Sequence, residues 1–213
     1  MAPRRRLTVV EDPGSELTRT SRLSQAIAEG DGISLIARVA DVDAARAAET
    51  QGAEALVLNR PVDGVREATS LPLLWVAAGG PSEAADAGVD AWRLVVAQVD
   101  ETEGRLEQLH AEAVELGLEC VVDVCDEEEI ALALERLDPE IFLLSSRSAD
   151  AEEEPLDRVL HLLPDVPAGK LAIADVPLRG REDVVALERA GIDGVIVSGI
   201  DVGELAGGAA PAV

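Results

Sequence analysis

Residues 119–137, Glu-Cys-Val-Val-Asp-Val-Cys-Asp-Glu-Glu-Glu-Ile-Ala-Leu-Ala-Leu-Glu-Arg-Leu, hold the pattern that decides the fold. The first part is a short run rich in β-branched residues, which predicts a strand over 119–125. The second part opens with acidic residues that suit a helix N-terminus and predicts a helix over 126–137. A strand followed directly by a helix is the building unit of a parallel sheet.

The same unit recurs along the chain, with helices ending at glycines such as Gly52, Gly117 and Gly191. The predicted strands cover 33–40, 54–59, 71–77, 91–98, 119–125, 140–146, 170–176 and 194–198. The predicted helices between them cover 41–51, 63–69, 82–87, 101–116, 126–137, 154–163 and 181–190. Eight such units in 213 residues favour a (β/α)8 TIM barrel with shortened loops over a doubly wound sheet. An open parallel sheet is the alternative, because helix 63–69 and the tail after Asp201 are short.

Length and charge indicate one compact domain over residues 21–213, preceded by a flexible N-terminal arm over residues 1–20. The chain carries 18 basic and 42 acidic residues and a net charge of −24, so we expect no nucleic-acid partner and no binding to anionic membranes. The basic start is followed only by Leu7-Thr-Val-Val10 before an acidic and Pro-Gly stretch. That run is too short for a signal peptide, so we expect a cytoplasmic protein.

In a (β/α)8 barrel the functional residues lie at the carboxyl ends of the strands. This rule selects Arg38, Asn59, Val76, Gln98, Asp123, Ser145, Ser146, Arg147, Asp175 and Ser198. The only lysine, Lys170, begins a predicted strand and falls at the opposite end. We expect no metal site, because Cys120 and Cys125 have no partner at metal-ligand spacing and the acidic runs are consecutive helix residues that do not face one ion.

Several of these strands resemble those of the indole-3-glycerol phosphate synthase family. Val121-Val-Asp-Val-Cys-Asp-Glu-Glu-Glu-Ile130 resembles the family's fifth strand and helix start, Leu-Val-Glu-Val-His-Asp-Glu-Glu-Glu-Leu. Gly88-Val-Asp-Ala-Trp-Arg-Leu-Val-Val-Ala97 resembles its fourth strand, and Ile36-Ala-Arg-Val-Ala40 resembles its first strand, Ile-Ala-Glu-Val-Lys. The stretch from Ile141 to Arg147 resembles the sixth strand, which ends Asn-Asn-Arg. The order and spacing match along residues 22–200.

The resemblance implies a phosphate-binding barrel that closes an indole ring on an anilino deoxyribulose phosphate, with loss of carbon dioxide and water and with no metal or organic cofactor. The family's general-acid lysine on the third strand corresponds to Val76, and its first-strand glutamate and lysine correspond to Arg38 and Ala40. Its fifth- and seventh-strand glutamates correspond to Asp123 and Asp175. The asparagine pair corresponds to Ser145 and Ser146, while Arg147 is retained.

These departures weaken the implied chemistry, since ring closure needs a group that delivers a proton and no lysine stands at the mouth. Asp123 and Asp175 are the candidate acid and base, each one methylene shorter than glutamate. The phosphate loops depart as well, since Pro177 has no N–H and the glycine after the eighth strand corresponds to Ser198. Arg179, Gly180, Arg181 and Gly199 are the residues that could compensate.

Two functions from different classes follow. The first is an active carboxy-lyase in which Asp123 and Asp175 act as acid and base while Arg38, Ser145, Ser146, Arg147, Arg179, Gly180, Ser198 and Gly199 bind substrate. The second is a diverged barrel with lost or strongly reduced activity that binds a small anionic or sugar-phosphate ligand or a protein partner. Arg38 also has a structural interpretation, as an arginine paired with Asp123 or Asp175. The sequence leaves the oligomeric state open.

Overall fold

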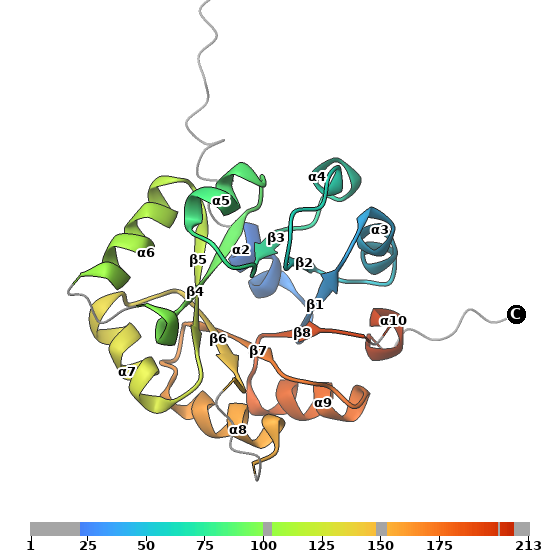
Figure 1. Ribbon diagram of the computed structural model, residues 1–213. Helices are drawn as coiled ribbons and strands as arrows, with labels where there is room; N and C mark the ends of the chain where they lie inside the picture. The colour runs from blue at the N-terminus through green and yellow to red at the C-terminus, as the bar shows by residue number, and fades with distance from the viewer. Residues whose placement is uncertain (1–21, 100–103, 148–152, 200, 207–213) are drawn as a thin grey trace, which may run out of the picture.

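The computed structural model describes residues 22–99, 104–147, 153–199 and 201–206, and the predicted arm over residues 1–20 lies outside them. Eight parallel strands form a closed barrel in which each strand pairs with the next and β8 pairs with β1 (Figure 1). The strands are β1 (Ser34–Val39), β2 (Ala55–Leu58), β3 (Leu73–Trp75), β4 (Ala91–Val95), β5 (Glu119–Val124), β6 (Ile141–Ser145), β7 (Leu171–Asp175) and β8 (Gly194–Val197). The predicted (β/α)8 barrel is confirmed, and the open-sheet alternative is wrong.

Helices surround the barrel and connect its strands (Figure 1). They are α3 (Val42–Thr50), α4 (Val65–Ala68), α5 (Pro81–Asp86), α6 (Arg105–Glu115), α7 (Glu127–Arg136), α8 (Pro155–Leu162), α9 (Arg181–Ala190) and α10 (Val202–Leu205), with short 3-10 turns η1 (Val96–Gln98) and η2 (Leu163–Asp165). None of the helices in the described part of the chain has the length and apolar character needed to cross a membrane.

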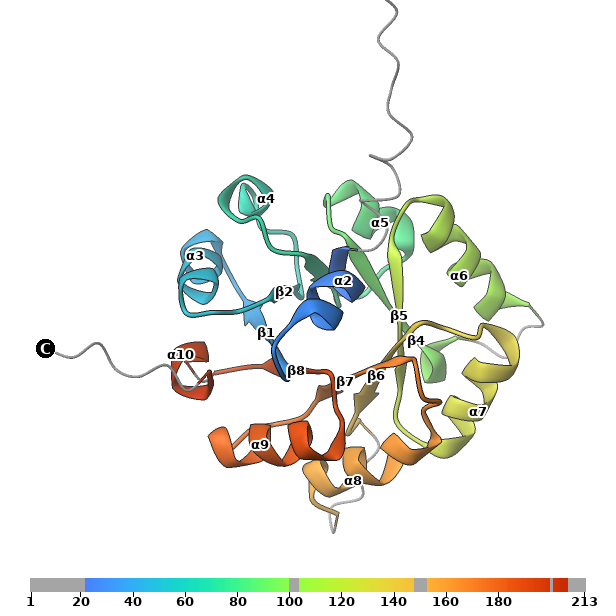
Figure 2. The ribbon, with the colours of Figure 1, turned by 180° about the vertical axis from the view of Figure 1, so that it is seen from behind.

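One further helix, α2 (Arg22–Glu29), precedes β1 and covers the amino-terminal end of the barrel, which we call the floor (Figure 2). Its Leu23 and Ile27 are buried with lumen-facing residues such as Ile36, Val57 and Leu74. The Glu119 side chain at the start of β5 accepts hydrogen bonds from the backbone N–H groups of Leu23 and Ser24. A carboxylate therefore caps the helix that closes the floor.

The alternation of side chains along each strand separates two apolar layers. The smaller layer fills the lumen, and the larger one lies between the strands and the outer helices. Phe142, Trp75 and Trp92 belong to the outer layer, with the two tryptophans side by side on β3 and β4. The next residue after Trp75, Val76, belongs to the lumen instead.

One strand differs from its prediction in a way that affects the site. The predicted strand 91–98 ends as β4 at Val95, and Val96–Gln98 form the 3-10 turn η1. The sequence around Val96 contains no glycine or proline that would mark the change from strand to turn. Gln98 is therefore on an exposed turn rather than at the end of the strand.

Candidate functional site at the barrel mouth

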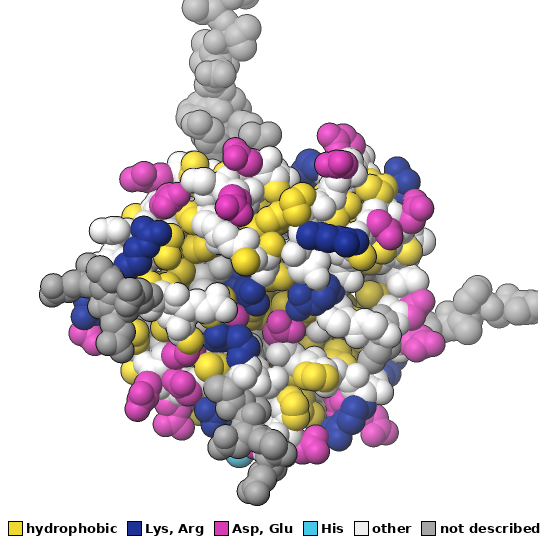
Figure 3. Space-filling view, in the orientation of Figure 1, with side chains coloured by type: hydrophobic (Ala, Val, Ile, Leu, Met, Phe, Trp, Pro, Cys, Tyr) yellow, Lys and Arg dark blue, Asp and Glu magenta, His cyan; other side chains and the backbone are white. Residues whose placement is uncertain are grey.

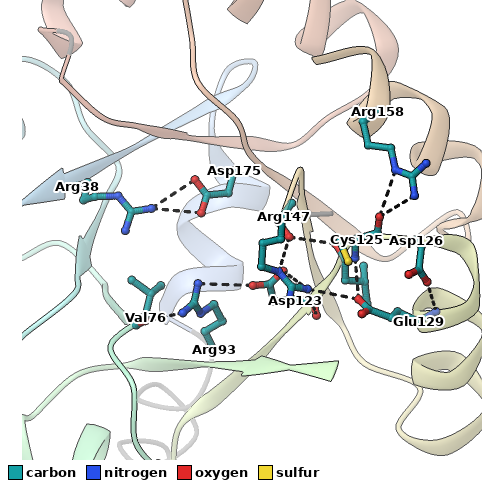
Figure 4. Close-up of polar contacts among 12 residues, drawn as sticks. Arg38, Val76, Arg93, Asp123, Cys125, Asp126, Glu129, Arg147, Arg158 and Asp175 are labelled. Atoms are coloured by element: carbon teal, nitrogen blue, oxygen red, sulfur yellow. Dashed lines mark hydrogen bonds and ion pairs between the residues drawn. The ribbon is translucent and has the colours of Figure 1, made fainter. Parts of the chain in front are cut away.

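The carboxyl ends of the strands surround a hollow, which we call the mouth, where basic and acidic side chains gather (Figure 3). Arg38 extends from β1, Arg93 from β4, Asp123 from β5 and Asp175 from β7, and Arg147 follows β6 (Figure 4). Successive side chains on a strand point to opposite faces, so residues two positions apart share a face. The charged strand residues stand two positions after lumen-facing residues such as Ile36, Val121 and Ile173, and they therefore also face the lumen side. The lumen below the mouth is apolar, whereas the mouth is charged.

The predicted convergence of charged residues is confirmed on the β1–β7 side. Arg38 Nη2 contacts both carboxylate oxygens of Asp175, at 3.2 and 3.3 Å. The Nε atom of Arg38 donates to the Ser198 hydroxyl at 3.0 Å. Both charged side chains are about one quarter exposed, so Asp175 and Arg38 form an ion pair that remains open to a ligand or to solvent.

Asp123 lies deeper, between two arginines. Its carboxylate has no solvent exposure, and it contacts Arg147 Nη2 at 3.2 Å and Arg93 Nη1 at 3.5 Å. Neither of its oxygens has a well-aligned hydrogen-bond donor among the described residues. Burial raises the pKa of Asp123, and Arg147, Ser145 and Arg93 oppose that rise by favouring the charged form.

Arg147 is held in place by several neighbours. Its Nε atom donates to Ser145 Oγ at 2.9 Å, and its Nη2 atom donates to the Asp123 carbonyl at 3.4 Å and to Glu129 at 3.3 Å. Ser145 is buried and in turn approaches the Val124 carbonyl at 3.5 Å. Arg147 and Ser145 therefore lie at the mouth as predicted. Ser146 lies between them in sequence, as a half-buried residue directly after the end of β6.

Arg93 is the mouth residue that the strand-end rule missed. Its Nη2 atom donates to the Val76 carbonyl at 2.7 Å, and its Nε atom is buried without a hydrogen-bond partner in the described structure (Figure 4). Burial lowers its pKa, while Asp123 and Asp175 act in the opposite direction. The rule selected Gln98 because the predicted strand, 91–98, extends three residues beyond the end of β4 at Val95. A single charge within an otherwise apolar strand was the signal that could have identified Arg93.

Apart from Ser198, which accepts from Arg38, the predicted phosphate-loop residues do not join this cluster. Arg179 is largely exposed and is bound to Asp183, the third residue of α9, through both its side chain and its backbone N–H. Gly180 is the N-cap of α9 in an extended conformation, and Gly199 follows Ser198 with a positive φ of 73°. Of this group only Ser198 contacts a mouth arginine.

A possible cation site lies beside the mouth, where Cys125, Asp126 and Glu129 have ligand atoms within 4.8 Å of one another. The carboxylates are already engaged, because Asp126 accepts from the Glu129 N–H and Glu129 accepts from the Cys125 N–H and from Arg147. These bonds cap the start of α7, with Asp126 as the N-cap and Glu129 reaching back to the residue before it. A cation there would have to displace Arg147, so the donor set does not fit a resident metal.

The fold and the position of the site define the class: a (β/α)8 barrel whose candidate site lies at the carboxyl ends of its strands. Two solved structures share this fold. The N-acetylmannosamine-6-phosphate 2-epimerase from Clostridium perfringens matches with a TM-score of 0.64 and 14% identity, over 79% of this chain and 87% of the other. The thiamine phosphate pyrophosphorylase from Pyrococcus furiosus matches with a TM-score of 0.60 and 16% identity, over 81% of this chain and 90% of the other. Identities this low show the fold alone.

Sequence comparison is more specific. Residues 82–200 match the family model of indole-3-glycerol phosphate synthase, and this chain belongs to that family. Proteins named indole-3-glycerol phosphate synthase from Salinibacter ruber and Halalkalibacterium halodurans are 35% and 34% identical over 118 and 110 residues, which is 54% and 52% of this chain. Each alignment covers 42% of the relative, so the match spans less than half of those proteins.

Proposed function

We propose that this chain is a diverged indole-3-glycerol phosphate synthase-like barrel that binds a small anionic ligand at the mouth and has lost most or all carboxy-lyase activity. The ligand class includes sugar phosphates and other small anions. The observation that carries the proposal is the identity of the cationic groups at the mouth. They are the guanidiniums of Arg38, Arg93 and Arg147, each in contact with a carboxylate.

The family resemblance places a general-acid lysine where this chain has Val76, and Val76 is a buried member of the lumen layer. The only lysine, Lys170, immediately precedes β7 at the floor, and there it contacts Asp138 at 3.0 Å and Glu140 at 3.5 Å. An arginine stays protonated near neutral pH and is therefore a poor proton donor, although it binds anions well. The mouth is thus better suited to binding than to general-acid catalysis.

The test is to give the purified protein the anilino deoxyribulose phosphate substrate and follow formation of indole-glycerol phosphate by its fluorescence. We expect a rate several orders of magnitude below that of an intact family member, because general-acid catalysis alone contributes a factor of about 10² to 10⁴. Binding of the substrate is measured separately by calorimetry and should persist. Turnover at the rate of an intact family member would overturn the proposal.

One observation favours a second candidate, an active lyase with Asp123 as the acid. The raised pKa of the buried Asp123 is the property that a carboxylic acid needs to donate a proton near neutral pH. In that case activity falls as pH rises through the pKa of Asp123, because the protonated form is lost. Asp123→Asn would abolish the activity, and Asp175→Asn would show whether the second carboxylate acts as the base. A weak activity that neither substitution slows would come from a contaminating enzyme.

A further inference from the structure

A groove of about 310 Å³ lies at the floor of the barrel, between the start of α2 and the end of α6. Figure 2 shows both helices from the floor side. Val114, Leu118 and Pro139 line the groove, together with the acidic Asp138 and Glu140. We call it the floor groove. It is at the opposite end of the barrel from the mouth, so the candidate functional site does not account for it.

Exposed apolar side chains gather beside the floor groove. Val114, which lines it, is 51% exposed, and Leu116, two residues further along the chain, is 43% exposed. They are two of the three large apolar side chains that are exposed among the described residues, and the third, Leu132, is on α7. Exposed apolar side chains that cluster, unlike scattered single ones, mark interaction surfaces. The groove therefore has the character of a docking surface.

The edge of the groove is acidic. The side chains of Asp138 and Glu140 are 77% and 82% exposed, and both contact the single ammonium group of Lys170. Two carboxylates share one cation, which leaves one negative charge uncompensated. Burial lowers the pKa of His110, another lining residue, so its imidazole adds no positive charge near neutral pH. The edge therefore attracts a positively charged segment.

Residues 1–21, which lie outside the described structure, have the matching chemistry. Leu7-Thr-Val-Val10 follows directly on Arg4-Arg-Arg6. The segment has four arginines and three acidic residues, so it is net positive in a chain whose net charge is −24. In an extended conformation Leu7 and Val9 share one face, because successive side chains alternate. This stretch therefore combines an apolar face with an adjacent block of positive charge.

The point of attachment places this segment beside the groove. The chain enters α2 at Arg22, and Ser24, two residues later, lines the floor groove. Residues 11–21 separate the apolar stretch from α2 and span up to about 36 Å when extended, which is enough to turn back to the groove. A flexible tether of this kind gives an effective concentration in the millimolar range. A second copy of the chain at micromolar concentration does not match that.

We propose that residues 4–10 dock in the floor groove of the same molecule. Leu7 and Val9 pack against Val114, and the three arginines lie at the acidic edge formed by Asp138 and Glu140. The proposal concerns the floor, so it does not depend on the function proposed for the mouth.

The test is proximity cross-linking in the full-length protein. Thr8→Cys, on the face opposite Leu7 and Val9, is combined with Ala111→Cys, an exposed position one turn before Val114 on α6. The matched control combines Thr8→Cys with Ala131→Cys, an exposed position on α7. With a short bismaleimide we expect the first pair to cross-link within one chain about tenfold faster than the control, as intact mass spectrometry measures. The native Cys120 and Cys125 are buried and compete little.

Equal rates for the two pairs would overturn the proposal. Products that join two chains would also overturn it, because the groove would then take the segment of a second copy. In the first pair, Leu7→Asp should lower the rate to that of the control, since it places a charge against Val114. Leu17→Asp, the same substitution outside the apolar stretch, should leave the rate unchanged. Neither substitution alters a residue of the barrel. An unaffected rate in Leu7→Asp, or a slower one in Leu17→Asp, would show that residues 4–10 are not the occupant.

Discussion

Asp123 connects stability to function at the scale of single residues. Its fully buried carboxylate is the shared counter-charge for Arg93, which lies on β4, and for Arg147, which follows β6. A buried ion pair contributes little compared with apolar packing, but removal of one partner leaves a charge in a poorly solvated place. The same contacts that hold the two arginines toward the mouth therefore make the barrel sensitive to changes at Asp123.

We predict that Asp123→Ala lowers the free energy of unfolding by about 3 kcal/mol, because it leaves Arg93 without its carboxylate and Arg147 with only Glu129. Urea denaturation at pH 7 measures the change. The control is the double variant Arg93→Met with Asp123→Leu, which removes the charge along with its partner and should recover most of the loss. A loss below about 1 kcal/mol in Asp123→Ala would show that the arginines are adequately solvated without it.

The sequence reveals most of these residues but not their pairing. Arg38, Asp123, Arg147 and Asp175 were predicted at the mouth because strand ends can be located from apolar runs. Arg93 was missed because its strand ends at Val95, three residues before the predicted end at Gln98. Which carboxylate each arginine contacts depends on the stagger of the closed barrel, and that is a property of all eight strands together.

At the scale of elements, α2 shows how a short helix outside the barrel contributes to its core. Leu23 has no exposure and Ile27 is 3% exposed, so the helix places its apolar side against the floor of the lumen. Its N-terminus is capped by Glu119. Burial raises the pKa of Glu119, and hydrogen bonds from Ser24 and Leu23 oppose that rise. The residues of α2 and β5 are nearly one hundred positions apart in sequence, so this contact ties the start of the domain to its middle.

We predict that Leu23→Ala lowers the free energy of unfolding by about 3 kcal/mol, since it leaves a cavity at the floor that the rigid strands cannot fill. Gln25→Ala on the exposed side of the same helix is the matched control and should change stability by less than about 0.5 kcal/mol. Thermal and urea denaturation of both variants check this. Equal effects of the two substitutions would mean that α2 does not pack as described.

The stability that a second element, helix α9, contributes to the fold depends on pH through the Asp183 carboxylate. Because the folded pKa of Asp183 lies below its unfolded value, the carboxylate stabilises the fold above the unfolded pKa and loses this effect as pH falls through the folded one. We predict that Asp183→Ala lowers the free energy of unfolding by about 1 kcal/mol at pH 7, as loss of a helix-capping group does. The difference in the free energy of unfolding between this variant and the wild type, measured by urea denaturation, should be constant between about pH 5 and 7 and should shrink below about pH 4. A difference that grows toward acid pH would contradict this sign.

Helix α9 also shows how far sequence reasoning reaches for elements. The predicted bounds, residues 181–190, are those of the helix in the structure, because acidic residues mark its start and Gly191 marks its end. By contrast α4 has only four residues where seven were predicted over 63–69, since Gly64 in a left-handed conformation starts it late and Thr69 returns to extended backbone. Clear capping residues fix an element's bounds, whereas loop residues with mixed propensities do not.

At the scale of the whole molecule, charge is the dominant feature. A net charge of −24 on 213 residues places many carboxylates close together on the surface, and ion pairs such as Arg46–Asp43 and Arg136–Glu107 balance only some of them. Self-repulsion of this kind destabilises a compact state, and added salt screens it.

We predict that the melting temperature rises as NaCl increases from about 0.01 to 0.5 M, where the screening length falls from about 30 Å to less than 8 Å. Differential scanning fluorimetry with the two tryptophans as probes measures it. Sucrose at matched osmolality separates screening from solute exclusion. A melting temperature that falls over this range would mean that favourable ion pairs outweigh repulsion.

The position of Lys170 has a practical consequence for handling the protein. The lone lysine side chain lies at the rim of the floor, held by Asp138 and Glu140, which keep its pKa above the ordinary value and its amine protonated. The mouth contains guanidiniums instead, which amine-reactive esters do not modify. Dyes, biotin or a sensor surface attached through the lysine amine would therefore leave the guanidiniums of the mouth unmodified. Dicarbonyl reagents such as phenylglyoxal, which react with arginine, would probe that side directly. Protection of Arg38, Arg93 or Arg147 by a bound ligand could then be read by mass spectrometry.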